Sequence, residues 1–205
     1  MNKFIFYFGT MGCAKTANAL MLRFQYIQNK KFVLLIKPSI DNRDDDADGT
    51  TKIKSRIGLE APAMIIKPDE NIYETYAKMC SKYTPDVIIC DEAQFFTPIQ
   101  VEQLRDLCTN MKVDIICFGL RTDFQTNAFP GAQRLFELAD EFRQLDAICN
   151  CGEPAIVNAR FDSSGRLITK GAQVAIGGDD MYKPLCWRCY RRHLNLGGKL
   201  NGSTN

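Results

Sequence analysis

The sequence predicts an α/β protein, in which a parallel sheet with helices on both faces is followed by a small C-terminal lobe of different construction. Over the first two thirds of the chain, short apolar runs that suit buried strands alternate with segments of helical apolar spacing. This alternation predicts βαβ units. From Cys149 onward it stops, and cysteine pairs bracket shorter β-like pieces. We therefore expect a first domain over residues 1–145, a second over 146–194 and a flexible tail over 195–205.

Each expected element has its own local signal. Apolar runs that end at glycine, proline or a carboxylate predict strands at Phe4–Phe8, Phe32–Ile36, Val87–Cys90 and Val113–Phe118. Helical spacing, or proline at a first turn, predicts helices at Lys15–Asn29, Ile72–Tyr83, Pro98–Met111 and Gly131–Leu138. Residues 41–59 are rich in aspartate and show no periodicity, which predicts a mobile loop. In the second domain, Ala155–Phe161 and Gln173–Ile176 have β-like patterns.

Composition limits the classes of function. The 205 residues carry a formal net charge of +2, which is too small to indicate binding to nucleic acid or to an acidic membrane. The longest apolar runs have strand length, and Met1–Phe8 lacks the pattern of a signal peptide. We expect a cytoplasmic protein with no nucleic-acid partner and no membrane partner. Five cysteines stand singly and are expected in the core: Cys13, Cys80, Cys90, Cys108 and Cys117.

The first strand leads directly into a candidate phosphate-binding loop. Its residues are Gly9, Thr10, Met11, Gly12, Cys13, Ala14, Lys15 and Thr16. In a G-x-x-x-x-G-K-[ST] loop, backbone N–H groups surround the phosphates, the lysine contacts them and the hydroxyl binds Mg²⁺. Ala14 stands where the second glycine belongs, and a positive φ there would cost alanine about 1–2 kcal/mol. An ordinary strand–turn–helix with a solvated Lys15 remains the alternative for this motif by itself.

A second motif strengthens the phosphate-loop interpretation. Val87–Cys90 delivers Asp91 and Glu92 to the carboxyl end of a buried strand, the edge where open α/β sheets bind ligands. Asp91 suits Mg²⁺, and Glu92 is the best candidate for a general base, because the only histidine, His193, lies near the C-terminus. A carboxylate pair that only caps the next helix is the alternative. Together the motifs predict a P-loop (RecA-like) sheet and an ATP-dependent phosphotransferase.

Two close cysteine pairs predict a metal site. Cys149 and Cys151 form the first pair, and Cys186 and Cys189 the second, with 34 residues between the pairs. Four thiolates and no open position are typical of a structural zinc ion. That ion would tie the base of the long intervening loop. Disulfides or free thiols are the alternative.

The segment Asp91–Phe96, DEAQFF, resembles the DE(A/G)QFF signature of type II thymidine kinases. Lys54–Leu59, Gly119–Phe124, and Ile176–Gly178 followed by Tyr182 are similar to further motifs of that family. The resemblance implies transfer of the γ-phosphate of ATP to the 5′-hydroxyl of thymidine, with Mg²⁺ and a structural zinc ion. It also implies a zinc-clasped lasso that holds the nucleoside, a homotetramer, and feedback inhibition by dTTP.

The resemblance also assigns roles to individual residues. It makes Glu92 the base, places Mg²⁺ on Asp91 and Thr16, and lets Arg43, with Lys15, neutralise the transferring phosphoryl group. The residues that it implies for thymidine are Met11, Asp41, Phe95, Phe124, Gln173, Val174, Ala175, Ile176, Gly177 and Tyr182.

Two other functions remain open from the sequence. Ala14 could weaken ATP binding so far that the chain is a degenerate nucleotide-binding module. Alternatively, the same scaffold could be a zinc-containing ATPase that acts on nucleic acid, against which the low net charge argues. Turnover that requires thymidine would separate both from a kinase.

Overall fold

The computed structural model describes residues 2–40, 51–173 and 181–199, and its centre is a six-stranded sheet. The strand order is β5-β2-β6-β7-β1-β8, and every neighbouring pair is parallel. The strands are β1 (Phe4–Phe8), β2 (Val33–Pro38), β5 (Met64–Ile66), β6 (Val87–Cys90), β7 (Asp114–Gly119) and β8 (Glu141–Gln144). This confirms the α/β class that the sequence predicts.

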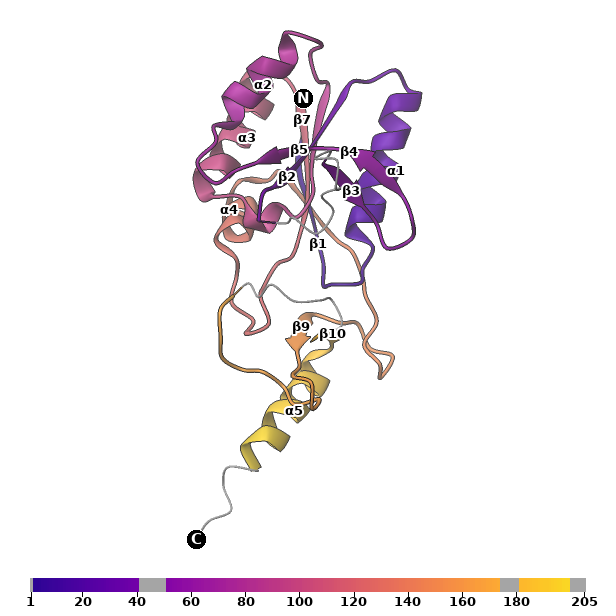
Figure 1. The fold of residues 1–205 in the computed structure, drawn as a ribbon, viewed down its shortest axis with the longest axis vertical. Helices are drawn as coiled ribbons and strands as arrows, with labels where there is room; N and C mark the ends of the chain where they lie inside the picture. The colour runs from indigo at the N-terminus through magenta and orange to yellow at the C-terminus, as the bar shows by residue number, and fades with distance from the viewer. Residues whose placement is uncertain (1, 41–50, 174–180, 200–205) are drawn as a thin grey trace.

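Helices cover both faces of the sheet (Figure 1). On one face, α1 (Lys15–Gln28) and the antiparallel pair β3 (Lys52–Lys54) and β4 (Glu60–Pro62) pack over the apolar side chains of β2, β6 and β7. The other face carries α2 (Ile72–Cys80), α3 (Pro98–Asn110) and α4 (Pro130–Leu138) and holds the larger apolar cluster. Burial on both faces explains why the central strands read as continuous apolar runs.

The C-terminal lobe lies beyond the carboxyl edge of the sheet (Figure 1). It consists of the antiparallel strands β9 (Val157–Arg160) and β10 (Tyr182–Leu185), followed by α5 (Trp187–Lys199). A separate apolar cluster fills it, and Cys13 of the candidate phosphate loop belongs to that cluster. The lobe is therefore packed directly against the end of β1.

Several elements differ from the sequence-based expectation. The expected loop over 41–59 contains β3, and the remainder of it, 41–50, lies outside the described residues. The strands β4, β5 and β8 have no clear sequence signal, because they are short or, like β8, mostly exposed. Helix α5 continues to Lys199, which corrects the expected tail start at residue 195; Leu194 packs against the lobe's apolar cluster there. Gln173 is not in a strand, and 174–176 lie outside the described residues.

Among the described residues, no helix has both the length and the apolar character needed to cross a membrane.

Candidate active site

The loop between β1 and α1 has the backbone geometry of a tight anion-binding turn. Gly12 has a φ of +82°, and Ala14, the residue before α1, has a φ of 59° and a ψ of 32°. The position expected to require glycine is thus in the left-handed region while occupied by alanine. Left-handed backbone costs an L-residue about 1–2 kcal/mol. The loop stores strain at the start of α1, where helical N–H groups are free to meet an anion.

Lys15 lies inside this loop and is buried. Its Nζ donates to the carbonyl of Thr10 at 2.8 Å and approaches the carbonyl of Gly9 at 3.5 Å. Gly9 sits so close to the chain after β8 that an added Cβ would lie 2.4 Å from the carbonyl oxygen of Leu145. The ammonium is thus held at the centre of the turn, where it can reach a phosphate without a large movement of the loop.

Asp91 and Glu92 follow β6 at the same edge of the sheet. Asp91 is 3% exposed, and its backbone N–H donates to the carbonyl of Ile36 in β2. Desolvation, with repulsion from Glu92, raises the pKa of Asp91 to about 7, although a hydrogen bond from Thr16 and the charge of Lys15 act in the opposite direction. Its Oδ1 is buried and has no hydrogen-bond partner among the described residues. The side chains of Lys15, Thr16, Asp91 and Glu92 therefore lie together at this edge of the sheet.

Glu92 is held in an unusual conformation. Its φ of 49° places it in the left-handed region, immediately before the 3-10 turn Ala93–Phe95. One carboxylate oxygen accepts a 2.6 Å hydrogen bond from the amide of Gln94. The oxygen of that buried amide, Oε1, accepts from the backbone N–H of Leu120, just after β7, at 2.9 Å. Gln94 thus fixes the direction of the Glu92 carboxylate, and strained backbone of this kind is concentrated at functional sites.

The aromatic residues expected near a nucleoside lie on the loops around this edge. Phe95 is partly buried and makes an edge-to-face contact with Phe129, with centroids 5.4 Å apart. Phe124 is only 1% exposed, and the guanidinium of Arg160 lies over its ring at 5.4 Å. The same guanidinium lies 5.9 Å from the centroid of the Tyr182 ring. Arg160 therefore joins two of the expected residues.

Hydrogen bonds also fasten the segment that leads into residues 174–180. Asp123 is buried, and its Oδ1 accepts from the backbone N–H groups of Gln125 and Asn127, which fixes the loop that carries Phe124. Its Oδ2 accepts from the amide of Gln173 at 3.1 Å. Gln125 in turn donates to the carbonyl of Thr169 at 2.9 Å. The loop after β7 is thus hydrogen-bonded to Thr169 and Gln173 of the C-terminal lobe.

The four paired cysteines form one cluster. The sulfur atoms of Cys149, Cys151, Cys186 and Cys189 all lie within 4.8 Å of one another. Cys151 and Cys186 are 3.6 Å apart at sulfur, much longer than a disulfide bond. Tetrahedral zinc with Zn–S bonds of about 2.3 Å separates its sulfurs by about 3.8 Å. The donor set and the spacing therefore fit a closed zinc site, and not a disulfide.

The electrostatics of the cluster also suit a metal. A hydrogen bond from the backbone near Glu153, together with hydrogen bonds from the other sulfurs, lowers the pKa of Cys151 to about 6. Hydrogen bonding to Cys151 raises the pKa of Cys189 to about 12, because a thiolate at Cys151 is stabilised when Cys189 keeps its proton. A bound cation would stabilise all of these sulfurs as thiolates, which is the form in which cysteine binds metal ions.

Comparisons with known proteins identify the family. The family model described as thymidine kinase matches residues 2–190. The chain belongs to the thymidine kinase family. It is 35% identical to the thymidine kinase of Zymomonas mobilis over 95% of this chain and 99% of that protein. It is 38% identical to that of Ruegeria pomeroyi over 93% of this chain and 94% of that protein.

Solved structures give only a weak comparison. The Pif1 helicase from Candida albicans is 13% identical, over 70% of this chain and 36% of that chain, with a TM-score of 0.40.

The structure brings together many of the residues that the sequence suggests for a thymidine kinase. The phosphate loop, Asp91 and Glu92 meet at one edge, and Phe124, Gln173 and Tyr182 lie around the loop after β7. Asp41, Arg43, Val174, Ala175, Ile176 and Gly177 lie outside the described residues. Sequence reasoning missed Gln94, Asp123, Asn158 and Arg160. Gln94 lies in the DEAQFF match and Asp123 in the matched segment Gly119–Phe124, so a signal was available for these two.

Proposed function

We propose that this protein transfers the γ-phosphate of ATP to the 5′-hydroxyl of thymidine and so produces dTMP. The observation that carries the proposal is the convergence of Lys15, Thr16, Asp91 and Glu92 at the carboxyl edge of β1 and β6, in a chain of the thymidine kinase family. Those four side chains supply a cation for phosphate, two oxygen ligands for a metal and a carboxylate base. Phosphoryl transfer depends almost entirely on such positioning and charge stabilisation.

In this proposal the phosphate loop holds ATP. Backbone N–H groups of the loop from Gly9 to Thr16, apart from those such as Met11 that donate within the protein, contact the phosphates, and Lys15 moves from the Thr10 carbonyl to the β- and γ-phosphates. Arg43 adds positive charge beside the transferring group. The Thr16 hydroxyl and the Oδ1 of Asp91, which has no hydrogen-bond partner among the described residues, fit Mg²⁺, which prefers oxygen ligands and would neutralise phosphate charge when bound.

Glu92 takes the proton from the 5′-hydroxyl as the oxygen attacks. The Gln94 amide keeps the carboxylate pointed in one direction, so that no rotation is required during the reaction. Phe95 and Phe124 wall in the thymine ring, and backbone groups of residues 173–177, with Met11, Asp41 and Tyr182, complete the nucleoside site. Zinc on the four cysteines would be structural, because the four sulfur ligands leave no open coordination position.

We also propose that the chain forms a homotetramer and is inhibited by dTTP, as the family resemblance implies. Apolar side chains on the outer face of α1 support association: Met21, Phe24 and Ile27 are 45%, 61% and 42% exposed, respectively. They are spaced three residues apart and so share one face of the helix. Contiguous exposed apolar surface of this kind is typical of an interface between chains.

The deciding experiment measures ATP-dependent phosphorylation of the four deoxynucleosides and deoxyuridine by metal-replete protein. Turnover confined to thymidine and deoxyuridine supports the proposal. Thymidine binding without turnover would indicate a degenerate module. ATP hydrolysis that DNA stimulates, without a need for thymidine, would indicate the nucleic-acid ATPase instead. Sedimentation of the same preparation tests the tetramer, and added dTTP tests the inhibition.

A further inference from the structure

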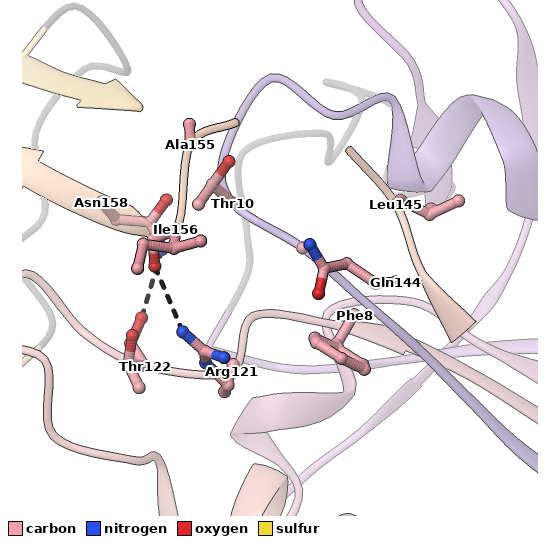
Figure 2. A pocket seen from close by; sticks show the side chains of 10 residues that line it. Phe8, Thr10, Arg121, Thr122, Gln144, Leu145, Ala155, Ile156 and Asn158 are labelled. Atoms are coloured by element: carbon pink, nitrogen blue, oxygen red, sulfur yellow. Dashed lines mark hydrogen bonds between the residues drawn. The ribbon is translucent and has the colours of Figure 1, made fainter. Parts of the chain in front are cut away.

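Asn158 connects three separate parts of the chain. It lies in β9 of the C-terminal lobe and is 3% exposed. Its Oδ1 accepts from the backbone N–H of Met11 in the phosphate loop at 2.7 Å. Its Nδ2 donates to the carbonyl of Thr122, in the loop after β7, at 3.2 Å, as Figure 2 shows. One buried amide thus joins the lobe to both loops that form the edge of the site.

The bond to Met11 differs in origin from other hydrogen bonds that hold the phosphate loop. The N–H of Gly9 donates to the carbonyl of Gly119, and the carbonyl of Thr10 accepts from Lys15, so these groups are held by the sheet domain itself. The N–H of Met11 instead points into the lobe. While it donates to Asn158, this N–H is not available to a phosphate.

The surroundings of Asn158 include a small cleft and the side chain of Thr10. A small cleft of about 20 Å³, close to the space that one water molecule needs, lies between the loop and the lobe and is lined in part by Thr10, Thr122 and Asn158 (Figure 2). The Thr10 hydroxyl is buried and has no hydrogen-bond partner among the described residues. At this seam the loop and the lobe are joined by the hydrogen bond from Met11 to Asn158, whereas the neighbouring Thr10 hydroxyl adds none among the described residues.

We propose that Asn158 is a positioning residue through which the C-terminal lobe holds the phosphate loop in its nucleotide-binding conformation. The inference rests on the proposed function, because it takes the loop as the ATP site. Without the Asn158 acceptor, the partly buried N–H of Met11 loses its protein partner, and the loop rotates to expose it to water. Only the fraction of molecules with the correct loop then binds nucleotide, which lowers the apparent affinity in proportion.

The experiment compares the wild-type protein with Asn158→Leu, which has a similar size and no hydrogen-bonding group. Mg·ADP binding is measured by calorimetry without nucleoside, and hydrogen exchange of the Met11 amide is followed by NMR. We expect ADP affinity to fall about ten-fold, as loss of one hydrogen bond to a buried group predicts, and Met11 exchange to accelerate. Zinc content and the fluorescence of Trp187 should not change.

A matched control is Asn2→Leu. Asn2 also joins distant segments through its amide, which donates to the carbonyl of Lys112 at 2.7 Å, but it lies before β1 at the opposite edge of the sheet. Its loss should lower stability and leave ADP affinity unchanged. The smaller Asn158→Ser variant is judged by the same measurements if Asn158→Leu does not fold.

Unchanged ADP affinity in a folded Asn158 variant would overturn the proposal. So would a loss of affinity that is accompanied by loss of zinc, because the residue would then only stabilise the lobe. The kinase proposal fails separately: wild-type protein that binds ADP but does not phosphorylate thymidine would refute it and still leave the Asn158 comparison valid.

Discussion

The sheet domain and the C-terminal lobe are stabilised in different ways. In the sheet domain, two apolar clusters pack on opposite faces of six strands, and β6 lies at their centre with every side chain buried. In the lobe, a two-stranded sheet and one helix surround a single smaller cluster, and two of its cysteines, Cys149 and Cys186, belong to that cluster as well as to the candidate metal site. A two-stranded sheet is marginal by itself. We therefore expect the lobe to depend on a bound metal where the sheet domain depends on burial.

The largest expected effect follows from removing one sulfur. Cys186→Ser should abolish zinc binding and unfold the lobe locally while the sheet domain stays folded, because structural zinc contributes about 10–16 kcal/mol to small domains that depend on it. Trp187, the only tryptophan, adjoins Cys186, and its fluorescence reports the lobe selectively. Metal content and Trp187 emission should change together, whereas far-ultraviolet circular dichroism should largely persist.

Cys80→Ser is the control for this variant. Cys80 lies at the end of α2, is partly buried and is outside the cysteine cluster. The zinc content of the Cys80→Ser protein should equal that of the wild type. Global unfolding of Cys186→Ser would show that the two regions are not separable, and retained zinc would remove Cys186 from the ligand set.

The next effect separates chemistry from nucleoside binding. Glu92→Gln keeps the shape of the side chain but cannot accept a proton, so kcat should fall about 10²–10⁴-fold, the usual contribution of a general base. Thymidine affinity, measured by calorimetry, should stay close to that of the wild type, since the proposed nucleoside contacts come from other loops. Glu137→Gln, an exposed carboxylate on α4 paired with Arg134, is the control and should leave kcat unchanged.

Turnover that is equal in Glu92→Gln and wild type would remove Glu92 as the base. A parallel loss of thymidine affinity would instead assign Glu92 to substrate binding.

A core substitution tests whether the sheet domain is the cooperative unit. Ile88 in β6 is fully buried and pairs in register with Leu34 and Ile115 in the flanking strands. Ile88→Ala should lower the free energy of unfolding by about 2–5 kcal/mol, from lost transfer energy and the cavity left behind. Urea denaturation followed by circular dichroism measures this. Loss of zinc without a change in the sheet transition would contradict the division between the two regions.

Sequence reasoning predicted the sheet domain well for the same reason that this domain is stable. Central strands such as Val87–Cys90 are buried on both faces and so appear as apolar runs, whereas β8, Glu141–Gln144, is an edge strand whose charged residues carry no such pattern. Because each motif follows a predicted strand, the sequence also predicted that Lys15 and Asp91 lie at the same edge of the sheet. Contacts such as Asn158 to Met11 join residues 147 apart and follow no periodicity, so only the fold reveals them.

The smallest expected effect concerns the strained start of α1. Ala14 has a φ of 59°, is exposed and makes no side-chain cap, so Ala14→Gly removes strain and loses no packing. Relief of about 1–2 kcal/mol is partly offset by the greater entropy of glycine in the unfolded chain, which leaves a net gain of about 0.5–1 kcal/mol. Thermal unfolding should shift upward by about 1–4 °C, and ADP should bind more tightly.

The reciprocal variant, Gly12→Ala, makes the Ala14 prediction stricter. Gly12 has a φ of +82° and an added Cβ would meet nothing within 4 Å, so this change adds backbone strain without a clash. Gly12→Ala should lower the melting temperature by about as much as Ala14→Gly raises it. If both variants shift stability as expected but ADP affinity follows neither, then the strain belongs to the fold alone. ADP affinity that rises in Ala14→Gly and falls in Gly12→Ala would instead show that the conformation of this loop limits nucleotide binding.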